Sequence, residues 1–583
     1  MYFSHSFSAF LFSLIVCLII SECYADVNAN PNASQNISKL VVDAGSGRNI
    51  PNTLFGVFYE EINHAGAGGL WAELVNNRGF EGGVAANLPP IYPWKIVGEN
   101  QSSITVSTDL SSCFERNKIA LRMDILCQGI SCPRGGVGIS NPGYWGMNVE
   151  QGKDYKVVFY VRALAPIDLK VSFVGTNDGV NLGSKIIKVD GPNVTKWSRM
   201  ERIIKATGHG FRSDLFKMVA DLKPKFLRFP GGCYVEGDFI KNAFRWKDSV
   251  GPWEERSGHL DDIWHYWSDD GLGYFEGLQL AEDLGALPIW VFNNGFSHHD
   301  EVSTDAIQPF VDEALDGIEF ARGPATSRWG SLRASMGHPE PFNLKFVAIG
   351  NEDCDIYDYH IYTNSNDMFS KYTKFDKSPR SGPKAFVSEY AVWKEDARVG
   401  SLYAAVAEAA FLIGIERNSD VVSMVSYAPL LLNTNDRGWI PDAIVFDSYQ
   451  SYGTPSYWVQ RLFIESSGAT LLNSTLQTSS PAIVASTIKY KNSQDGKNYL
   501  RVKVVNFGKD IENLGISING LNANVLRPFA SSMVVLTSSN IMDENSFSEP
   551  MKIVPRRAVF GIASKDMNVK LSPYSVTSLD LLF

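Results

Sequence analysis

Residues 208–462 alternate short apolar runs with helical stretches, and this alternation narrows the possible folds more than any other feature. Strands that alternate with helices form a parallel sheet. Most of the apolar runs end in polar or charged residues, which is typical of the C-terminal rim of a (β/α)8-type barrel, where catalytic groups sit. We therefore expect such a barrel. The apolar runs lie at 53–62, 224–232, 286–295, 344–352, 357–363, 384–391 and 423–429.

Two further regions show the period-two alternation of antiparallel sheets. The region at 85–206 would form a β-sandwich inserted after the first barrel strand, and the region at 466–583 would form a C-terminal β-sandwich. The first barrel strand lies within 39–84, and the rest of the catalytic barrel is expected at 207–465. The predicted fold class is therefore α/β plus all-β.

The N-terminus has the pattern of a secretory signal peptide at 1–25, with an apolar run at 9–20 before small residues. The run is too short to cross a bilayer, so we expect no membrane anchor; a buried N-terminal helix is the alternative. Sequons fit a glycoprotein secreted to the extracellular matrix or cell wall. The candidate glycosylation sites are Asn32, Asn36, Asn100, Asn193 and Asn473.

Charge and cysteine content argue against several classes of function. A net charge of -10 has the wrong sign for binding phosphate backbones, so nucleic acid is not an expected partner. The cysteines beyond the signal peptide are odd in number and form no CxxC pair, which argues against zinc and against a dense disulfide scaffold. At most two of Cys113, Cys127 and Cys132 are bridged. The adjacent His298 and His299 lack zinc spacing, and we expect no metal and no cofactor.

Two carboxyl groups close strands of the predicted barrel, Glu352 in the run at 344–352 and Glu389 in the run at 384–391. Glycoside hydrolysis needs such a pair, and a separation of about 5 to 5.5 Å selects the retaining, covalent route. Asn351 is placed to orient a sugar hydroxyl. The alternative is that both carboxylates form salt bridges at the rim, because ionic networks are common.

Other polar residues are predicted at equivalent strand ends. An arginine such as Arg228 keeps a neighbouring carboxylate charged, which suits a nucleophile. Gly231 and Gly232 make a turn or permit close approach to a ligand. A single histidine on an apolar strand is more often a core residue, so the coincidence at one rim is the stronger signal. The remaining rim residues are Glu60, Asn293, His360 and Tyr362.

The chain resembles plant α-L-arabinofuranosidases of glycoside hydrolase family 51 in the segments FGVFYEEINHAG, LRFPGGCYVEG, FNNGFSHHDEV, FVAIGNEDC, DYHIYT, AFVSEYAV and SYAPLLLNTND. The resemblance implies a retaining exo-hydrolase of cell-wall arabinan, arabinoxylan or arabinogalactan, with Glu352 as general acid/base and Glu389 as nucleophile. It also implies that the inserted sandwich is similar to a carbohydrate-binding module and that a strand near 39–46 joins the C-terminal sandwich. The residues implied to line the sugar subsite are Glu60, Arg228, Cys233, Asn351, His360 and Tyr362.

The chain departs from this family between Glu352 and Tyr357, where only residues 353–356 intervene. Parallel strands need a crossover of about a dozen residues or more. We therefore expect a barrel that lacks about one strand and one helix, and we hypothesise that this chain is impaired or poorly folded. A second shortening lies at 205–208.

Two other functions fit the same sequence, and the oligomeric state is left open. One is another retaining pentosidase, such as a β-xylosidase. The other is a catalytically impaired, secreted glycan-binding protein that holds polysaccharide through the inserted sandwich. Its candidate stacking residues are Trp94, Tyr144 and Trp145, although packing in a core is the more common use of such side chains.

Overall fold

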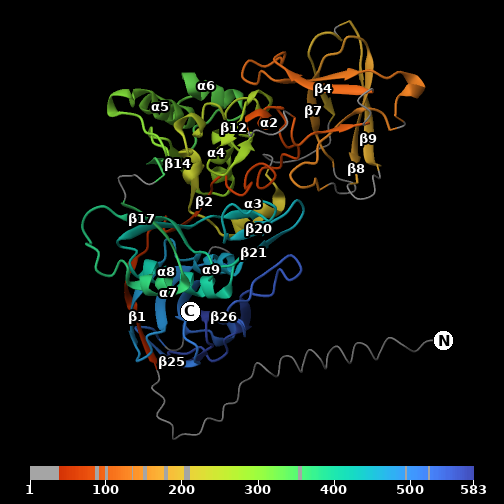
Figure 1. Cartoon of the computed structure of the whole chain (residues 1–583). Helices are drawn as coiled ribbons and strands as arrows, with labels where there is room; N and C mark the ends of the chain where they lie inside the picture. The colour runs from red at the N-terminus through yellow and green to blue at the C-terminus, as the bar shows by residue number, and fades with distance from the viewer. Residues whose placement is uncertain are drawn as a thin grey trace, which may run out of the picture.

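Seven parallel strands form the central sheet of a computed structural model of the chain, in the order β15-β14-β11-β2-β18-β17-β16 (Figure 1). The structure describes residues 38–85, 91–98, 103–133, 135–148, 154–175, 181–192, 194–202, 211–351, 357–492, 495–522 and 525–583. The strands of the central sheet are β2 (Phe55–Phe58), β11 (Phe226–Phe229), β14 (Leu287–Phe292), β15 (Phe346–Ile349), β16 (Tyr357–Thr363), β17 (Ala385–Val392) and β18 (Val422–Tyr427).

Helices connect these strands, as expected for a (β/α) barrel. They are α3 (Ser213–Asp221), α4 (Tyr274–Asp283), α5 (Gln308–Arg322), α6 (Arg328–Ser335), α7 (Ser365–Ser370), α8 (Leu402–Arg417) and α9 (Pro455–Phe463). The loops that follow the carboxyl ends of the barrel strands β11 and β18 contain short strands: β12 (His259–Asp261), β13 (Tyr266–Ser268), β19 (Leu431–Asn433), β20 (Ile444–Phe446) and β21 (Ser451–Gly453). None of the helices in the described residues is long and apolar enough to cross a bilayer.

The barrel is open between β15 and β16, which are the two edges of the sheet. Only residues 350–356 join these strands, and a crossover between parallel neighbours is normally longer. Apolar side chains on both edges are exposed: Val347 by 37%, Ile349 by 44% and Tyr357 by 58%. The prediction of a barrel that lacks one strand and its helix is therefore confirmed, and the gap lies where the fifth strand would stand.

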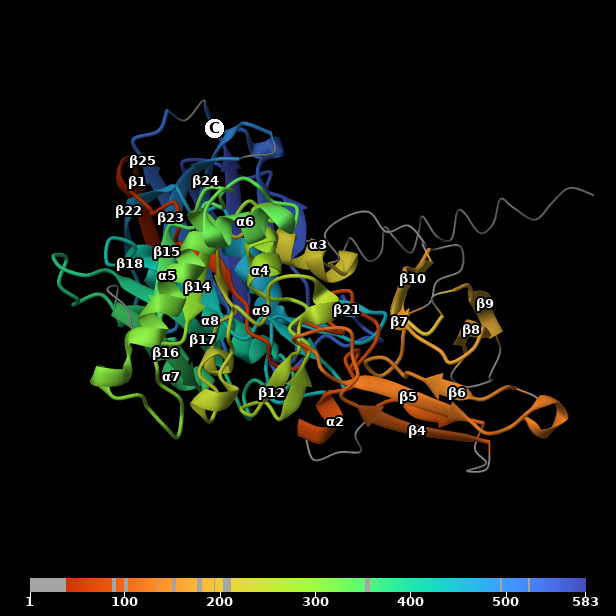
Figure 2. The ribbon, with the colours of Figure 1, turned by 90° about the horizontal axis from the view of Figure 1, so that it is seen from above.

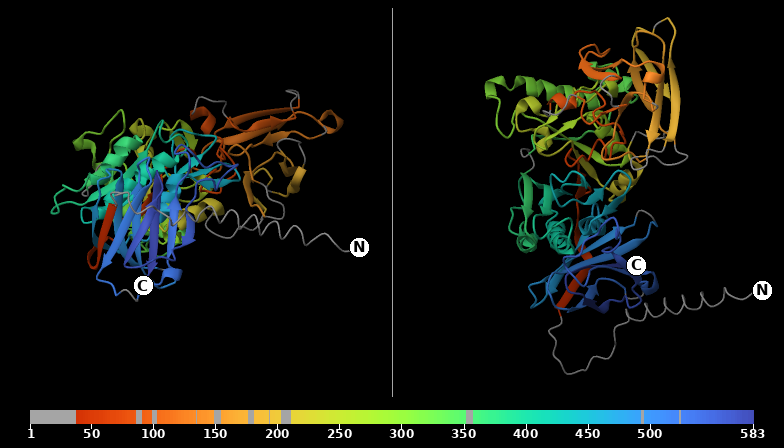
Figure 3. Two further views of the ribbon diagram at one scale, coloured as in Figure 1. Left: turned by 90° about the horizontal axis from the view of Figure 1, so that it is seen from below. Right: turned by 45° about the vertical axis from the view of Figure 1, so that its right-hand side comes forward.

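A nine-stranded sheet forms the C-terminal domain, and β1 (Ser38–Asn49) from the N-terminal side belongs to it. β1 pairs antiparallel with β22 (Thr470–Gln477) and parallel with β25 (Glu512–Asn519), and Figure 3 shows it in red among the blue strands. The other strands are β23 (Ile483–Lys491), β24 (Asn498–Asn506), β26 (Ser532–Leu536), β27 (Arg556–Val559), β28 (Asp566–Leu571) and β29 (Ser575–Leu582).

Helix α8 lies between the barrel and the C-terminal sheet. Its residues are apolar on all sides and almost all buried, as expected for a helix covered from both directions. Glu416 near its end forms an ion pair with Lys503 of β24, and both side chains are fully buried. The shared core and this pair attach the C-terminal domain firmly to the barrel.

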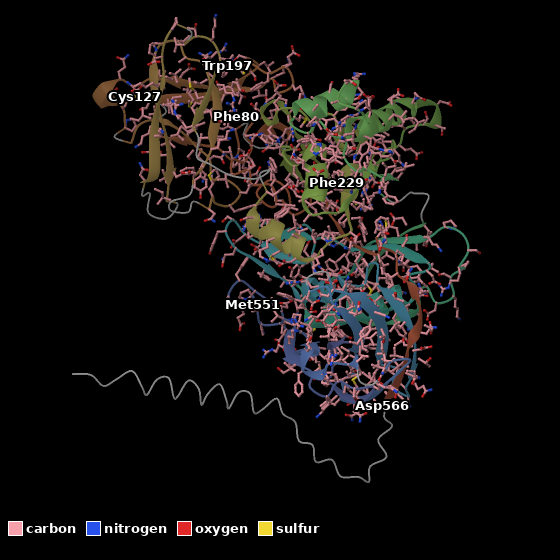
Figure 4. All side chains as sticks on the ribbon, turned by 180° about the vertical axis from the view of Figure 1, so that it is seen from behind. Phe80, Cys127, Trp197, Phe229, Met551 and Asp566 are labelled. Carbon is pink, nitrogen blue, oxygen red and sulfur yellow. A yellow bond between two sulfur atoms is a disulfide. The ribbon has the colours of Figure 1, made fainter. Side chains whose placement is uncertain are left out.

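The inserted region consists of antiparallel strand pairs beside the barrel (Figure 2). Its strands are β3 (Lys95–Val97) with β6 (Gly138–Ser140), β4 (Ile104–Asp109) with β5 (Ala120–Ile125), β7 (Val157–Val161) with β10 (Ser198–Arg202), and β8 (Ile167–Val174) with β9 (Asn181–Val189), after the short helix α2 (Gly82–Ala85). A disulfide joins Cys127 to Cys132. Figure 4 shows Cys127 in this region, Phe229 in the barrel and Asp566 in the C-terminal domain.

Candidate active site

Side chains from different barrel strands converge at the carboxyl ends of the sheet. Glu60 follows β2, Glu389 lies on β17 and Arg228 lies on β11. β16 carries a histidine and a tyrosine on one face, because alternate residues of a strand share a face. Asn351 follows β15 and completes the group. The residues brought together are Glu60, Arg228, Asn351, His360, Tyr362 and Glu389.

Glu389 is held by two donors from neighbouring strands. Arg228 Nη1 donates to Glu389 Oε1 at 3.2 Å, and Tyr362 Oη donates to Glu389 Oε2 at 2.7 Å. The Glu389 residue is only 6% exposed, so the positive charge of Arg228 acts at short range with little screening. The two donors fix the orientation of both carboxylate oxygens, which suits a nucleophile.

Arg228 is fully buried and organises several groups at once. Its Nη2 donates to the backbone oxygen of Asn351 at 2.8 Å and to Asn351 Oδ1 at 2.9 Å. The guanidinium also lies over the ring of Phe58, 5.1 Å from its centre. Because one cation fixes both Asn351 and Glu389, the spacing between β15 and β17 at the rim depends on this side chain.

Glu60 accepts two N–H donors on one carboxylate oxygen. Tyr234 N and Trp264 Nε1 both donate to Glu60 Oε1 at 3.0 Å. Burial, followed by the negative charge of Glu389, raises the pKa of Glu60 to about 8. At neutral pH Glu60 is therefore mostly protonated.

Glutamine at position 60 should remove a pH dependence of stability. A folded-state pKa near 8 means that Glu60 stabilises the fold fully below its unfolded pKa of about 4.3, and that this contribution is lost as the pH rises through 8. We expect the melting temperature of the wild type to fall relative to Glu60→Gln between about pH 5 and pH 8. Glu408, whose pKa burial also raises to about 8, is present in both proteins and cancels in the difference. Parallel curves over this range would contradict the assignment.

Phenylalanine at position 362 tests the hydrogen bond to Glu389. Burial and the charge of Glu389 raise the pKa of Tyr362 well above its usual value, so the hydroxyl remains a donor. A hydrogen bond to a charged group contributes about 1.5 to 3 kcal/mol, so Tyr362→Phe should lower kcat about 10- to 100-fold. Tyr359→Phe on the opposite face of β16 is the matched control and should leave kcat unchanged. Equal kcat values for the wild type and Tyr362→Phe would refute the role.

His360 lies beside both Asp358 and Glu389. Its Nδ1 is 3.7 Å from Glu389 Oε2, and its Nε2 is 3.4 Å from Asp358 Oδ2. Burial opposes the charged imidazole, but the neighbouring carboxylates, Glu389 first, raise the pKa of His360 above its usual value. The neighbouring carboxylates thus favour the protonated form of His360 beside Glu389.

The turn after β11 has a steric reason for its glycines. Gly231 and Gly232 have φ values of 57° and 58°, and a Cβ on Gly232 would lie 2.0 Å from the carboxyl carbon of Glu60. Gly232 therefore allows a close approach of the backbone to the side chain of Glu60. Cys233 follows at once and opens a short turn of helix, Cys233–Val235. Cys233 lies near Tyr362, so it borders the same pocket.

Three half-buried tryptophans surround the pocket, and the sequence analysis missed them. Trp264 donates to Glu60, and Trp439 lies with its ring centre 5.0 Å from that of Tyr362 and stacks on Trp393 at 5.0 Å. Trp393 comes directly after β17, so the strand-end criterion could have found it. Trp264 and Trp439 lie in loops where no periodic pattern marks them.

Other predicted residues lie elsewhere. The predicted site residues Glu352, Asn32, Asn36, Asn100 and Asn193 lie outside the described residues, as does the predicted signal peptide. Asn473 is exposed on β22. The side chain of Asn293 donates to the backbone oxygens of Phe296 in its own loop and of Val235 in the turn after β11. Among the candidate stacking residues, Tyr144 is buried and Trp94 donates to the Asn77 backbone, while Trp145 is 49% exposed.

A buried nucleophile-like carboxylate at the rim of a (β/α) barrel is the site architecture of a glycoside hydrolase. Comparison with known families gives two matches, "Alpha-L-arabinofuranosidase 1 domain" at residues 218–357 and "Alpha-L-arabinofuranosidase C-terminal domain" at residues 388–575. The solved structure of an arabinose-bound MgGH51 α-L-arabinofuranosidase is similar with a TM-score of 0.83 and 27% identity, covering 93% of this chain and 100% of that one.

Two relatives from Arabidopsis thaliana are similar along almost the whole chain. Alpha-L-arabinofuranosidase 1 is 56% identical, covering 93% of this chain and 91% of the relative, and Alpha-L-arabinofuranosidase 2 is 53% identical, covering 97% and 93%. The chain therefore belongs to the plant α-L-arabinofuranosidases of glycoside hydrolase family 51. The first alignment spans 617 positions, more than the 583 residues of the chain, so this relative has residues without a counterpart here.

Proposed function

We propose that this protein is an exo-acting α-L-arabinofuranosidase that releases terminal α-L-arabinofuranosyl residues from cell-wall arabinan, arabinoxylan or arabinogalactan with retention of configuration. The observation that carries the proposal is the fixed carboxylate of Glu389, with Arg228 on one oxygen and Tyr362 on the other. The similarity to named α-L-arabinofuranosidases supports an arabinofuranoside as the substrate class. The signal peptide pattern supports secretion to the cell wall.

The proposed reaction has two displacements. Glu389 attacks the anomeric carbon while Glu352 gives its proton to the leaving glycosidic oxygen, and an arabinosyl ester forms on Glu389. Glu352, now a carboxylate, takes a proton from water, and the resulting hydroxide equivalent cleaves the ester and frees arabinose. Arg228 and Tyr362 stabilise the charge on Glu389 before attack and after release.

The remaining pocket residues would recognise the sugar. Glu60, Asn351, His360 and Cys233 offer hydrogen-bonding groups around Glu389, and Trp393 and Trp439 offer aromatic faces at the edge. A protonated Glu60 can donate to a sugar hydroxyl at neutral pH, while its other oxygen keeps the two N–H partners.

A substrate panel tests this proposal against the related activities. The purified mature chain is given aryl α-L-arabinofuranoside, aryl β-D-xyloside and insoluble arabinoxylan. Release of chromophore from the arabinofuranoside alone supports the proposed function. Preference for the xyloside would replace it with another pentosidase activity, and binding to arabinoxylan without sugar release would replace it with glycan binding.

A further inference from the structure

A thiol, a carboxylate and an imidazole meet beside the sugar pocket. One ligand atom from each of Cys233, Glu236 and His298 lies within 4.8 Å of the other two, and these three form such a group within the described part of the chain. His298 Nε2 is 3.6 Å from Glu236 Oε2. His298 lies in the loop after β14, while Cys233 and Glu236 lie at the two ends of the turn after β11, so the group forms only when the barrel folds.

The spacing of these atoms fits a small tetrahedral ion. Zinc lies about 2.3 Å from a thiolate sulfur and about 2.0 to 2.2 Å from imidazole nitrogen and carboxylate oxygen, so ligand atoms around it are roughly 3.5 Å apart. The Glu236 to His298 separation already has this value, and small side-chain rotations close the rest. Thiolate and imidazole select zinc over magnesium and calcium, which prefer oxygen ligands.

We propose that Cys233, Glu236 and His298 form a binding site for Zn²⁺ at the edge of the sugar pocket, and that the bound ion inhibits hydrolysis. On binding, the Cys233 thiol releases its proton to solvent and the sulfur coordinates the ion, while three protein ligands leave a fourth position open to water. The inhibitory part rests on the proposed function; the binding part does not.

Two contacts connect this zinc site to the pocket. Glu236 Oε1 accepts the backbone N–H of Asn351 at 3.2 Å, and Arg228 in turn holds Asn351. Cys233 lies near Tyr362, whose hydroxyl donates to Glu389. An ion that draws both ligands toward itself therefore competes with the sugar and disturbs the support of Asn351.

Chelator competition with ZnCl₂ on the full chain tests the site without requiring turnover. We expect one Zn²⁺ per chain, and binding weakened at least about tenfold in His298→Ala, by loss of a ligand. His299→Ala is the matched control, because the neighbouring side chain is 60% exposed and its Nε2 lies 3.8 Å from Asp238. Binding in His298→Ala equal to that in the wild type, or no stoichiometric binding at all, would overturn the proposal.

Hydrolysis of an aryl α-L-arabinofuranoside gives the second readout. Zn²⁺ should inhibit the wild type and His299→Ala, and chelator should restore both. His298→Ala should keep the basal rate and lose the sensitivity. If Zn²⁺ binds stoichiometrically but leaves turnover unchanged, the inhibitory part is wrong; if the wild type has no turnover, the binding result alone decides.

Discussion

Replacing Glu389 with alanine should lower kcat on an aryl α-L-arabinofuranoside by about 10⁴-fold or more, since the variant has no group to form the covalent intermediate. The melting temperature should fall by several degrees, because the buried Arg228 loses its carboxylate partner and keeps only Asn351. Glu395→Ala is the matched control: this glutamate is exposed in the loop after β17, and its loss should leave kcat unchanged.

Azide distinguishes a missing nucleophile from a misfolded pocket. In Glu389→Ala the ion occupies the space of the carboxylate and attacks the anomeric carbon from the same side, while Glu352 protonates the leaving oxygen. Turnover should return, with an arabinofuranosyl azide of inverted configuration as product. A Glu389→Ala variant with a wild-type rate, or azide rescue with retained configuration, would contradict the assignment.

Closing the barrel should raise activity by about a hundredfold, because a displacement of roughly 1 Å in a catalytic group costs that much. A graft between Glu352 and Tyr357 would insert a crossover helix followed by one strand, the kind of connection that parallel neighbours normally have. The added strand would pair with β15 and β16 and cover Val347, Ile349 and Tyr357, which are now exposed. Complete burial of such a side chain contributes about 1.5 to 3 kcal/mol, and covering the part that is still exposed contributes roughly half of that, so the melting temperature should rise by a few degrees.

A flexible linker of equal length is the control for the graft. A Gly/Ser stretch lengthens the connection but supplies neither hydrogen bonds nor apolar side chains to the edges, so it should improve neither kcat nor melting temperature. The account of the open barrel fails if the strand graft leaves both quantities at the values of the original chain.

The order of strands and the missing strand could be predicted from the sequence because both depend on local patterns. Short apolar runs indicate the parallel strands, and the stretches between them, in which apolar residues recur every three to four positions, indicate the helices. The short connection after Glu352 violates a length requirement that any parallel crossover obeys. Both features are visible within a few dozen residues, and the sheet confirms them, with β15 and β16 as its edges.

The contacts of the site could be predicted only in part. Strand ends indicate that Arg228 and Glu389 lie on one rim, but they are 161 positions apart, and only the three-dimensional sheet shows that they form an ion pair. Trp264 and Glu236 lie in loops, whose conformation depends on contacts with distant segments. The sequence around His298 does not indicate a metal site, because the other two proposed ligands, Cys233 and Glu236, lie in the turn after β11 rather than in the loop after β14.

The most direct test of the central claim is mass spectrometry of the covalent intermediate. The wild-type chain is incubated with an activated 2-deoxy-2-fluoro-arabinofuranoside, whose fluorine slows hydrolysis of the ester by destabilising the oxocarbenium-like transition state. After proteolysis, we expect one fluoropentosyl group on the peptide that contains Glu389. A label on a different carboxylate, or turnover of this substrate with inversion and no labelled peptide, would contradict a retaining mechanism with Glu389 as the nucleophile.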